Sequence, residues 1–163
     1  MSVDRVGRIR TVVSGPSELL LSGRMLVWAG ALPLLKRVVP LSRLVTVMAP
    51  RHRRAPDAKR TQDVVTLARW MYRTRVLRDN CLERSLITYR YLPAGNEGSL
   101  LVLGVRKGDD GPPGHAWLIV NGVAVHDSDE TLEKLVPVVA FDLNGRRRPA
   151  PAPLSARPPA SPA

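Results

Sequence analysis

Cysteine is almost absent from this chain, which has one, Cys81, among its 163 residues. A single thiol cannot form an internal disulfide, so nothing in the sequence points to an oxidising compartment. A lone cysteine is most often a small buried hydrophobic residue. Its neighbours must therefore decide whether Cys81 is reactive.

Long uncharged apolar runs are also missing. The longest one near the N-terminus, Met25–Leu35, is interrupted by Pro33 and is about half of the roughly 20 residues that span a bilayer. The chain opens with alternating charges through Arg10 and has no clear cleavage site, which argues against a signal peptide. We therefore expect a cytoplasmic protein and leave peripheral membrane contact open.

Acidic residues are scarce in the first half of the chain. Residues 1–80 contain 16 Lys and Arg against 5 Asp and Glu, whereas residues 81–163 contain 9 of each kind. A basic half attracts acidic partners, although an ordinary solvated surface would have the same composition. Aromatic residues make up only 4% of the chain and no nucleic-acid motif is present, so we expect no nucleic-acid partner.

The hydrophobic pattern places helices first and strands second. Residues 17–35 form one helix, or two short ones broken near Pro33, and a short helix follows Pro40. After a basic connector, Thr61 is expected to cap a further helix, and another runs from about Asp79 to Leu92. No internal sequence repeat is visible.

The strands follow in the second half. Ser99–Arg106, His115–Val120 and Val123–Asp127 are rich in Val, Leu and Ile, with a fourth candidate at Val136–Asp142. This order predicts an α+β fold, with N-terminal helices followed by a small antiparallel β-sheet. We divide the chain into a basic amphipathic segment (1–60), a catalytic domain (61–145) and a Pro/Ala-rich disordered tail (146–163).

The position of Cys81 favours chemistry. A cysteine nucleophile acts as its thiolate, and Asp79-Asn80-Cys81 places the thiol in the first turn of a helix. The free N–H groups and the positive end of the helix dipole there stabilise negative sulfur. The same N–H groups, at Asn80 and Cys81, are candidates for an oxyanion hole.

A base must reach the thiol, and an acid must orient the base. His52 lies in the basic connector, so His115 and His126 are the better candidates. With a two-residue turn at Asn121-Gly122, His115 would face Ser128. With a three-residue loop that begins at Val120 and leaves Gly122 left-handed, His115 would face Asp127, with their Cβ atoms about 5 Å apart.

We prefer the longer loop, and hence His115 with Asp127, with Asp129 as the second choice of acid. This register would place Trp117, Ile119, Val123 and Val125 on one face and turn His126 away. The plainer alternative is that His115 ends a strand and Asp127 starts a loop. A zinc site at Cys81 lacks a fourth ligand and CxxC spacing.

Three motifs together resemble a known family. These are Asn80-Cys81-Leu82 with Arg84-Ser85-Leu86, then Leu103-Gly104-Val105-Arg106, and then His115-Ala116-Trp117 with Asn121-Gly122 and Asp127. From about Thr61 to Leu143 the chain resembles the lasso-peptide leader peptidases, the microcin-processing branch of the transglutaminase-like superfamily.

The resemblance implies a papain-like α+β fold, a Cys81–His115–Asp127 triad and cleavage of a ribosomally made precursor at its leader–core junction. It also implies two partners, a separate leader-recognition domain protein and an ATP-dependent cyclase. No cofactor is implied for this chain. Two features depart from the family: Leu118-Ile119, where an acid is common, and the Gly/Pro-rich loop 108–114.

Two other functions remain open from the residues. The same triad could transfer an acyl group to an amine, since one acyl-enzyme can be captured by water or by an amine. Alternatively, the chain could be a non-catalytic basic adaptor that docks a peptide or a membrane surface through its N-terminal half.

Overall fold

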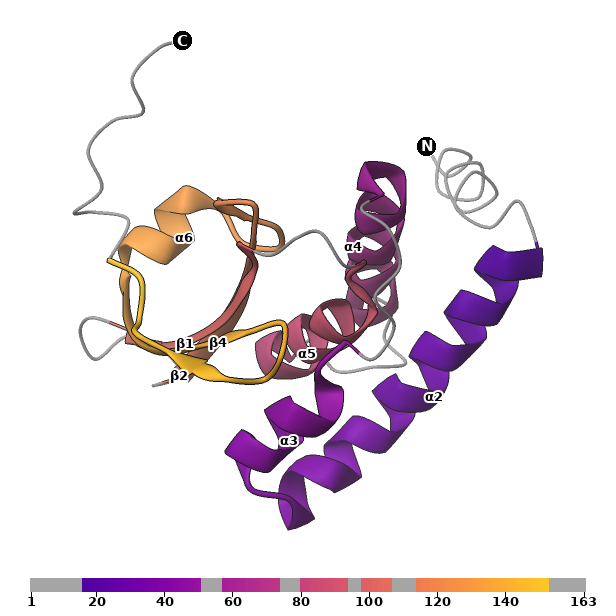
Figure 1. Cartoon of the computed structure of the whole chain (residues 1–163), viewed down its shortest axis with the longest axis horizontal. Coiled ribbons are helices and arrows are strands. Elements are labelled where there is room, and N and C mark those ends of the chain that lie inside the picture. Colours follow the sequence, from indigo (N-terminus) through magenta and orange to yellow (C-terminus); the bar gives the residue numbers. More distant parts are fainter. Residues whose placement is uncertain (1–15, 51–56, 74–79, 94–97, 107–113, 153–163) are drawn as a thin grey trace, which may run out of the picture.

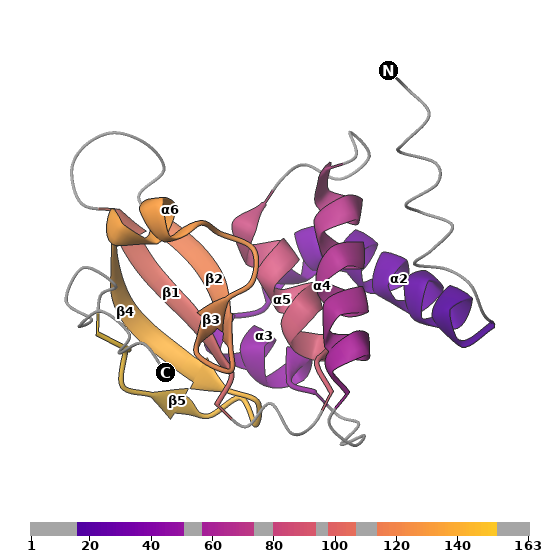
Figure 2. The same cartoon turned by 90° about the horizontal axis from the view of Figure 1, so that it is seen from above.

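A computed structural model describes residues 16–50, 57–73, 80–93, 98–106 and 114–152. Its helices lie mainly on one side of a five-stranded antiparallel sheet, as Figures 1 and 2 show. The fold class is therefore α+β, with N-terminal helices followed by an antiparallel sheet, as predicted.

The first described helix, α2 (Pro16–Val38), is continuous and carries Pro33 within it, so the first of the two alternatives, a single helix, is confirmed. A short helix, α3 (Leu41–Met48), follows as expected. The next, α4 (Ala58–Arg73), begins before Thr61. Asp57 caps it instead, since the Asp57 carboxylate accepts a hydrogen bond from the Arg60 N–H at 3.0 Å.

Helix α5 (Cys81–Tyr91) lies at the centre of the molecule. It contacts α2, α3 and α4 on one side and strand β2 on the other, and Figure 2 shows it between the sheet and the remaining helices. A buried hydroxyl fixes its C-terminal end: Tyr89 donates to the Asp142 carbonyl and accepts from the Gly145 N–H at 3.1 Å.

The strands are β1 (Leu100–Arg106), β2 (Gly114–Val120), β3 (Val123–Ala124), β4 (Leu135–Asp142) and β5 (Arg147–Arg148). Their order in the sheet is β3-β2-β1-β4-β5, and every pair is antiparallel. A short helix, α6 (Asp129–Glu133), connects β3 to β4. The fourth predicted strand is therefore confirmed, and the third is shorter than predicted.

The predicted tail is partly ordered. Residues 147–148 pair with Ala140 and Phe141 of β4. Arg148 holds this pairing through its Nη2, which lies 2.8 Å from the buried Asp142 Oδ2. A proline-rich composition therefore does not exclude a short strand where the Asp142 carboxylate binds Arg148. Residues 153–163 lie outside the described part of the chain.

Apolar side chains pack on both faces of the sheet. The larger core joins α2, α3, α4 and α5 to Leu101, Leu118 and Phe141 of the sheet. The smaller one gathers Val102, Trp117 and Ala140 with Leu132 of α6 on the opposite face. The N-terminal helices thus share the larger core with the sheet.

Candidate active site

Cys81 is the first residue of α5 and is half-buried. Asn80 adopts an extended backbone conformation before it and caps the helix. The Asn80 side-chain oxygen accepts hydrogen bonds from the N–H groups of Leu82 at 3.1 Å and Glu83 at 3.4 Å. This explains why the helix begins at the thiol, because Asn is among the best N-cap residues.

The cap has a consequence for the predicted oxyanion hole. The Leu82 and Glu83 N–H groups donate to Asn80 Oδ1, and the Leu82 N–H also stabilises the Cys81 thiolate, so the first turn offers fewer free donors than the sequence suggested. Glu83 is buried and pairs with Lys36 of α2 at 2.6 Å. The oxyanion-hole assignment to Asn80 and Cys81 stays a prediction.

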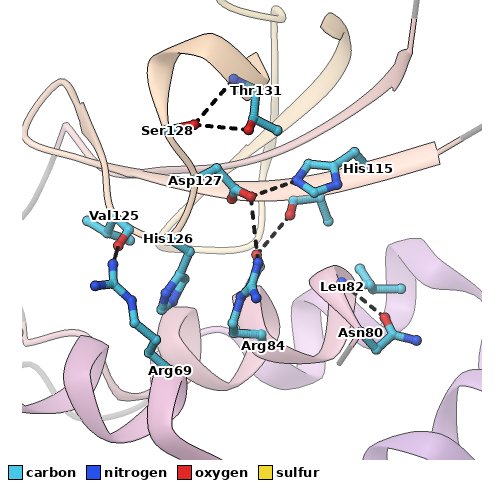
Figure 3. Close-up of polar contacts among 12 residues, drawn as sticks. Arg69, Asn80, Leu82, Arg84, His115, Val125, His126, Asp127, Ser128 and Thr131 are labelled. Atoms are coloured by element: carbon cyan, nitrogen blue, oxygen red, sulfur yellow. Dashed lines mark hydrogen bonds and ion pairs between the residues drawn. The ribbon is translucent and has the colours of Figure 1, made fainter. Parts of the chain in front are cut away.

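His115 and Asp127 lie together at the rim of the sheet, as predicted. His115 Nε2 is 3.0 Å from Asp127 Oδ1, and Figure 3 shows the two side chains facing each other above the start of α5. Cys81 is also close enough to His115 to raise the pKa of the imidazole. Because Nε2 is engaged by the carboxylate, Nδ1 is the nitrogen left for the thiol.

The register that led to this pair was wrong. Val120 pairs with Val123 and Ile119 with Ala124, so the turn has two residues. Asn121 and Gly122 both have positive φ, 51° and 82°, as a type I′ hairpin turn requires. Val123 is therefore exposed, and Val125 packs against the helix-side core, away from Trp117.

Asp127 reaches His115 because the chain leaves the strand. Pairing with β2 ends after the Val125 N–H, which donates to the Leu118 carbonyl at 3.1 Å. Residues 125–127 then bend. Without this bend, the two-residue turn would have placed Ser128 opposite His115.

Two contacts to the helices hold the bend. Arg69 of α4 donates to the Val125 carbonyl at 2.7 Å. His126 Nε2 lies 2.7 Å from the Thr88 hydroxyl of α5. Figure 3 shows the Arg69 and His126 side chains between this segment and the helices below it. Burial, with the charges of Arg84 and Arg69, lowers the pKa of His126 to about 4. His126 is therefore a neutral structural contact at pH 7.

Arg84 is a site residue that the sequence reasoning quoted only as part of a motif. Its Nη2 lies 3.6 Å from Asp127 Oδ1, and both side chains are mostly buried. Arg84 follows Cys81 by three residues, which places both near the same end of α5. Among the described residues, the buried Asp127 Oδ2 has no hydrogen-bond partner, and the Arg84 guanidinium lies beside the same carboxylate.

The electrostatics favour an ion pair between thiol and imidazole. The hydrogen bonds to Asp127 and Cys81 raise the pKa of His115 to about 9, against the opposing effect of burial. Burial opposes charge on Cys81, but hydrogen bonds from His115 and from the Ala116 and Leu82 backbone lower the pKa of its thiol overall. A thiolate beside an imidazolium is the reactive form of a cysteine nucleophile.

Trp117 supports His115 from within the same strand. The two rings stack with centroids 6.2 Å apart. Gly104 pairs with His115 across the sheet and makes room for the Trp117 ring. A Cβ at Gly104 would lie 2.8 Å from Trp117 Cη2 and would overlap the Val136 carbonyl oxygen. Trp117 also lines a small cavity with Ile119 and Leu132.

The remaining candidates are placed as follows. Asp129 begins α6 and lies at that cavity, while Asp127 occupies the position beside His115. His52 and residues 108–113 of the Gly/Pro-rich loop lie outside the described residues. Within the described ranges, no cluster of three or more His, Cys, Asp or Glu could hold a metal ion.

An α+β fold with a thiol at a helix start, an imidazole and a carboxylate is the arrangement of enzymes that form acyl-cysteine intermediates. A family model of the transglutaminase-like superfamily matches residues 25–140, and this chain belongs to that superfamily. The superfamily contains Cys-His-Asp cysteine peptidases and acyltransferases. Neither a curated protein nor a solved structure matches the chain.

Proposed function

We propose that this protein is a cysteine peptidase that removes the leader from a ribosomally made lasso-peptide precursor, with Cys81 as nucleophile, His115 as acid–base and Asp127 as the residue that orients His115. The observation that carries the catalytic part is the 3.0 Å contact between His115 Nε2 and Asp127 Oδ1. It directs the other imidazole nitrogen to the thiol at the start of α5.

The reaction would proceed through an acyl-enzyme. The Cys81 thiolate attacks the scissile carbonyl carbon, and the C–N bond breaks as protonated His115 gives its proton to the leaving amine. Water then attacks the thioester while His115 accepts a proton from it. The products are a free carboxylate and the restored thiol, so no cofactor is consumed.

The substrate class rests on the motif resemblance between Thr61 and Leu143, not on the site geometry. It implies that a separate leader-recognition domain presents the precursor and that an ATP-dependent cyclase closes the released core. Genes beside this one should then encode a short precursor, a leader-binding domain and an asparagine-synthetase-like cyclase. The isolated chain is expected to turn over slowly, because the leader-recognition module belongs to a partner.

The decisive measurement is cleavage of the cognate precursor by the full chain and by Cys81→Ala, each with the leader-recognition partner. The wild type should cleave at one site and Cys81→Ala should be inactive, with a loss of at least about 10³-fold. Because Cys81 is the only cysteine, alkylation of the wild-type thiol should abolish activity in proportion to modification. Equal cleavage by both proteins would overturn the proposal.

Hydrolysis and acyl transfer differ in what captures the acyl-enzyme. In H₂¹⁸O, hydrolysis places one ¹⁸O in the new carboxylate, whereas transfer to an added primary amine yields an amide without the label. If the amide is the main product although water competes with the amine for the acyl-enzyme, the protein would be assigned to the acyltransferases of the superfamily. Absence of both products with a matching precursor and partner would favour the non-catalytic adaptor.

A further inference from the structure

The outer side of α2 is apolar and exposed although the helix belongs to a folded core. Leu20, Val27 and Leu34, spaced seven residues apart, have exposed fractions of 70%, 72% and 66%. Residues seven apart lie on one side of a helix. We call this side the outer face of α2, with Leu19, Leu26 and Val38 beside it.

The opposite side of the same helix is buried. Leu21, Met25 and Leu32 lie in the core that α2 shares with α4 and α5. Both views place α2 on the side of α5 away from the sheet, at the edge of the molecule. A helix that is apolar on both sides needs a second apolar environment, because large exposed apolar patches on soluble proteins usually mark an interaction surface.

The stretch Leu19–Val38 is long and apolar enough to cross a membrane by length and composition, and only 22% of it is buried. A transmembrane orientation would remove Met25 and Leu32 from the core and would place Arg24 in the hydrocarbon layer. A helix that lies in the plane of the membrane surface keeps its core contacts and buries only its outer face.

The basic residues around the outer face of α2 indicate which kind of surface it binds. The sequence has no Asp or Glu between Glu18 and Asp57 but has seven Lys or Arg there. Arg24 on α2, Arg37 in its last turn and Arg43 on α3 are exposed. Cations next to an apolar helix face complement the anionic headgroups of a bilayer, which attract each basic side chain by about 1 kcal/mol.

We propose that the outer face of α2 docks this protein peripherally on an anionic membrane surface, with α2 parallel to the bilayer plane. The proposal is independent of the peptidase assignment, because the outer face consists of exposed residues of α2, whereas Cys81 is on α5, His115 on β2 and Asp127 in the bend after β3.

The test is flotation of the full-length protein with vesicles of phosphatidylcholine alone and with vesicles that also contain phosphatidylglycerol. Wild type should bind the anionic vesicles and should be released as salt rises, since the headgroup attraction is screened. The double variant Val27→Glu and Leu34→Glu should bind at least about tenfold more weakly. Arg37→Gln should weaken binding to the anionic vesicles about fivefold and should leave binding to phosphatidylcholine vesicles unchanged.

Val138→Glu is the matched control, because Val138 is 57% exposed on β4, away from α2. It should bind vesicles as wild type does, and thermal melts should show that all variants fold. Absence of wild-type binding to anionic vesicles at low salt would overturn the proposal. So would unchanged binding by the α2 double variant, or a wild-type dimer that the double variant converts to monomer without any vesicle binding, which would assign the face to a second copy.

Discussion

The two ends of α5 meet the sheet through different kinds of contact. At the C-terminal end, the Tyr89 hydroxyl is fully buried and bonds the backbone of the β4–β5 turn. At the N-terminal end, Cys81, His115 and Asp127 are titratable side chains that remain partly accessible. A helix anchored at one end by backbone contacts can keep reactive groups at the other, because the anchor does not depend on their charge.

The carboxylates at the two ends of α5 also differ in how many of their oxygens accept hydrogen bonds. The Asp142 carboxylate at the anchored end accepts bonds from the Asn144 and Arg146 N–H groups and from Arg148. The Asp127 carboxylate at the reactive end uses only Oδ1 among the described residues. Buried polar atoms without partners cost free energy, so their presence fits a site whose arrangement serves chemistry more than stability.

The largest expected effect belongs to the reactive end. Asp127→Asn should lower kcat for precursor cleavage by about 10²–10⁴-fold, because an amide removes the charge that orients and stabilises protonated His115. The melting temperature should change far less. Asp129→Asn is the matched control and should retain activity, since Asp129 does not contact His115. Equal activity of the Asp127 variant and wild type would remove Asp127 from the site.

The same variant tests the charge state of His115. Its pKa is raised to about 9, mainly by Asp127, so kcat/KM should fall as pH increases through about 9, when His115 loses the proton that it donates to the leaving amine. In Asp127→Asn this falling limb should move to lower pH. The pH dependence of Cys81 alkylation gives a second readout, and thiolate reactivity should persist below the ordinary pKa of cysteine.

At the anchored, C-terminal end of α5 a smaller effect is expected, and it concerns stability instead of activity. Tyr89→Phe removes both hydrogen bonds of the hydroxyl and leaves the Gly145 N–H and the Asp142 carbonyl only the bond between them, at 2.9 Å. Loss of the two bonds should lower the free energy of unfolding by about 1–3 kcal/mol. Urea unfolding measures this change. At temperatures where the variant is folded, its kcat and pH profile should match wild type. A shifted pH profile would show that the two ends are coupled.

The smallest effect concerns Arg84, which lies between the helix and the carboxylate. Arg84→Gln removes the charge 3.6 Å from Asp127 Oδ1 and should lower kcat about tenfold while KM is unchanged, as expected for a residue that positions another. Arg84→Lys should recover part of the loss. A loss confined to stability, with kcat unchanged, would make Arg84 a structural residue only.

Much of the architecture could be predicted from the order and periodicity of residues. The helix start at Cys81 follows from Asn80, whose side chain is a good cap wherever it occurs. The sequence predicts a turn at Asn121-Gly122 but does not fix its loop length, because both a two-residue and a three-residue loop accept glycine there. The three-residue loop, favoured because it places Gly122 at a left-handed position, predicts the right pair, His115 and Asp127, from the wrong register.

The sequence by itself determined the α+β class, the place of the thiol at the beginning of a helix and the identity of the histidine at the sheet rim, because each depends on neighbours in the chain. Only the tertiary structure decided how Asp127 reaches His115. That depends on Arg69 and Thr88, which lie 56 and 38 residues from their partners Val125 and His126. Local patterns contain no record of contacts across such separations, so the bend that completes the site had to be seen in three dimensions.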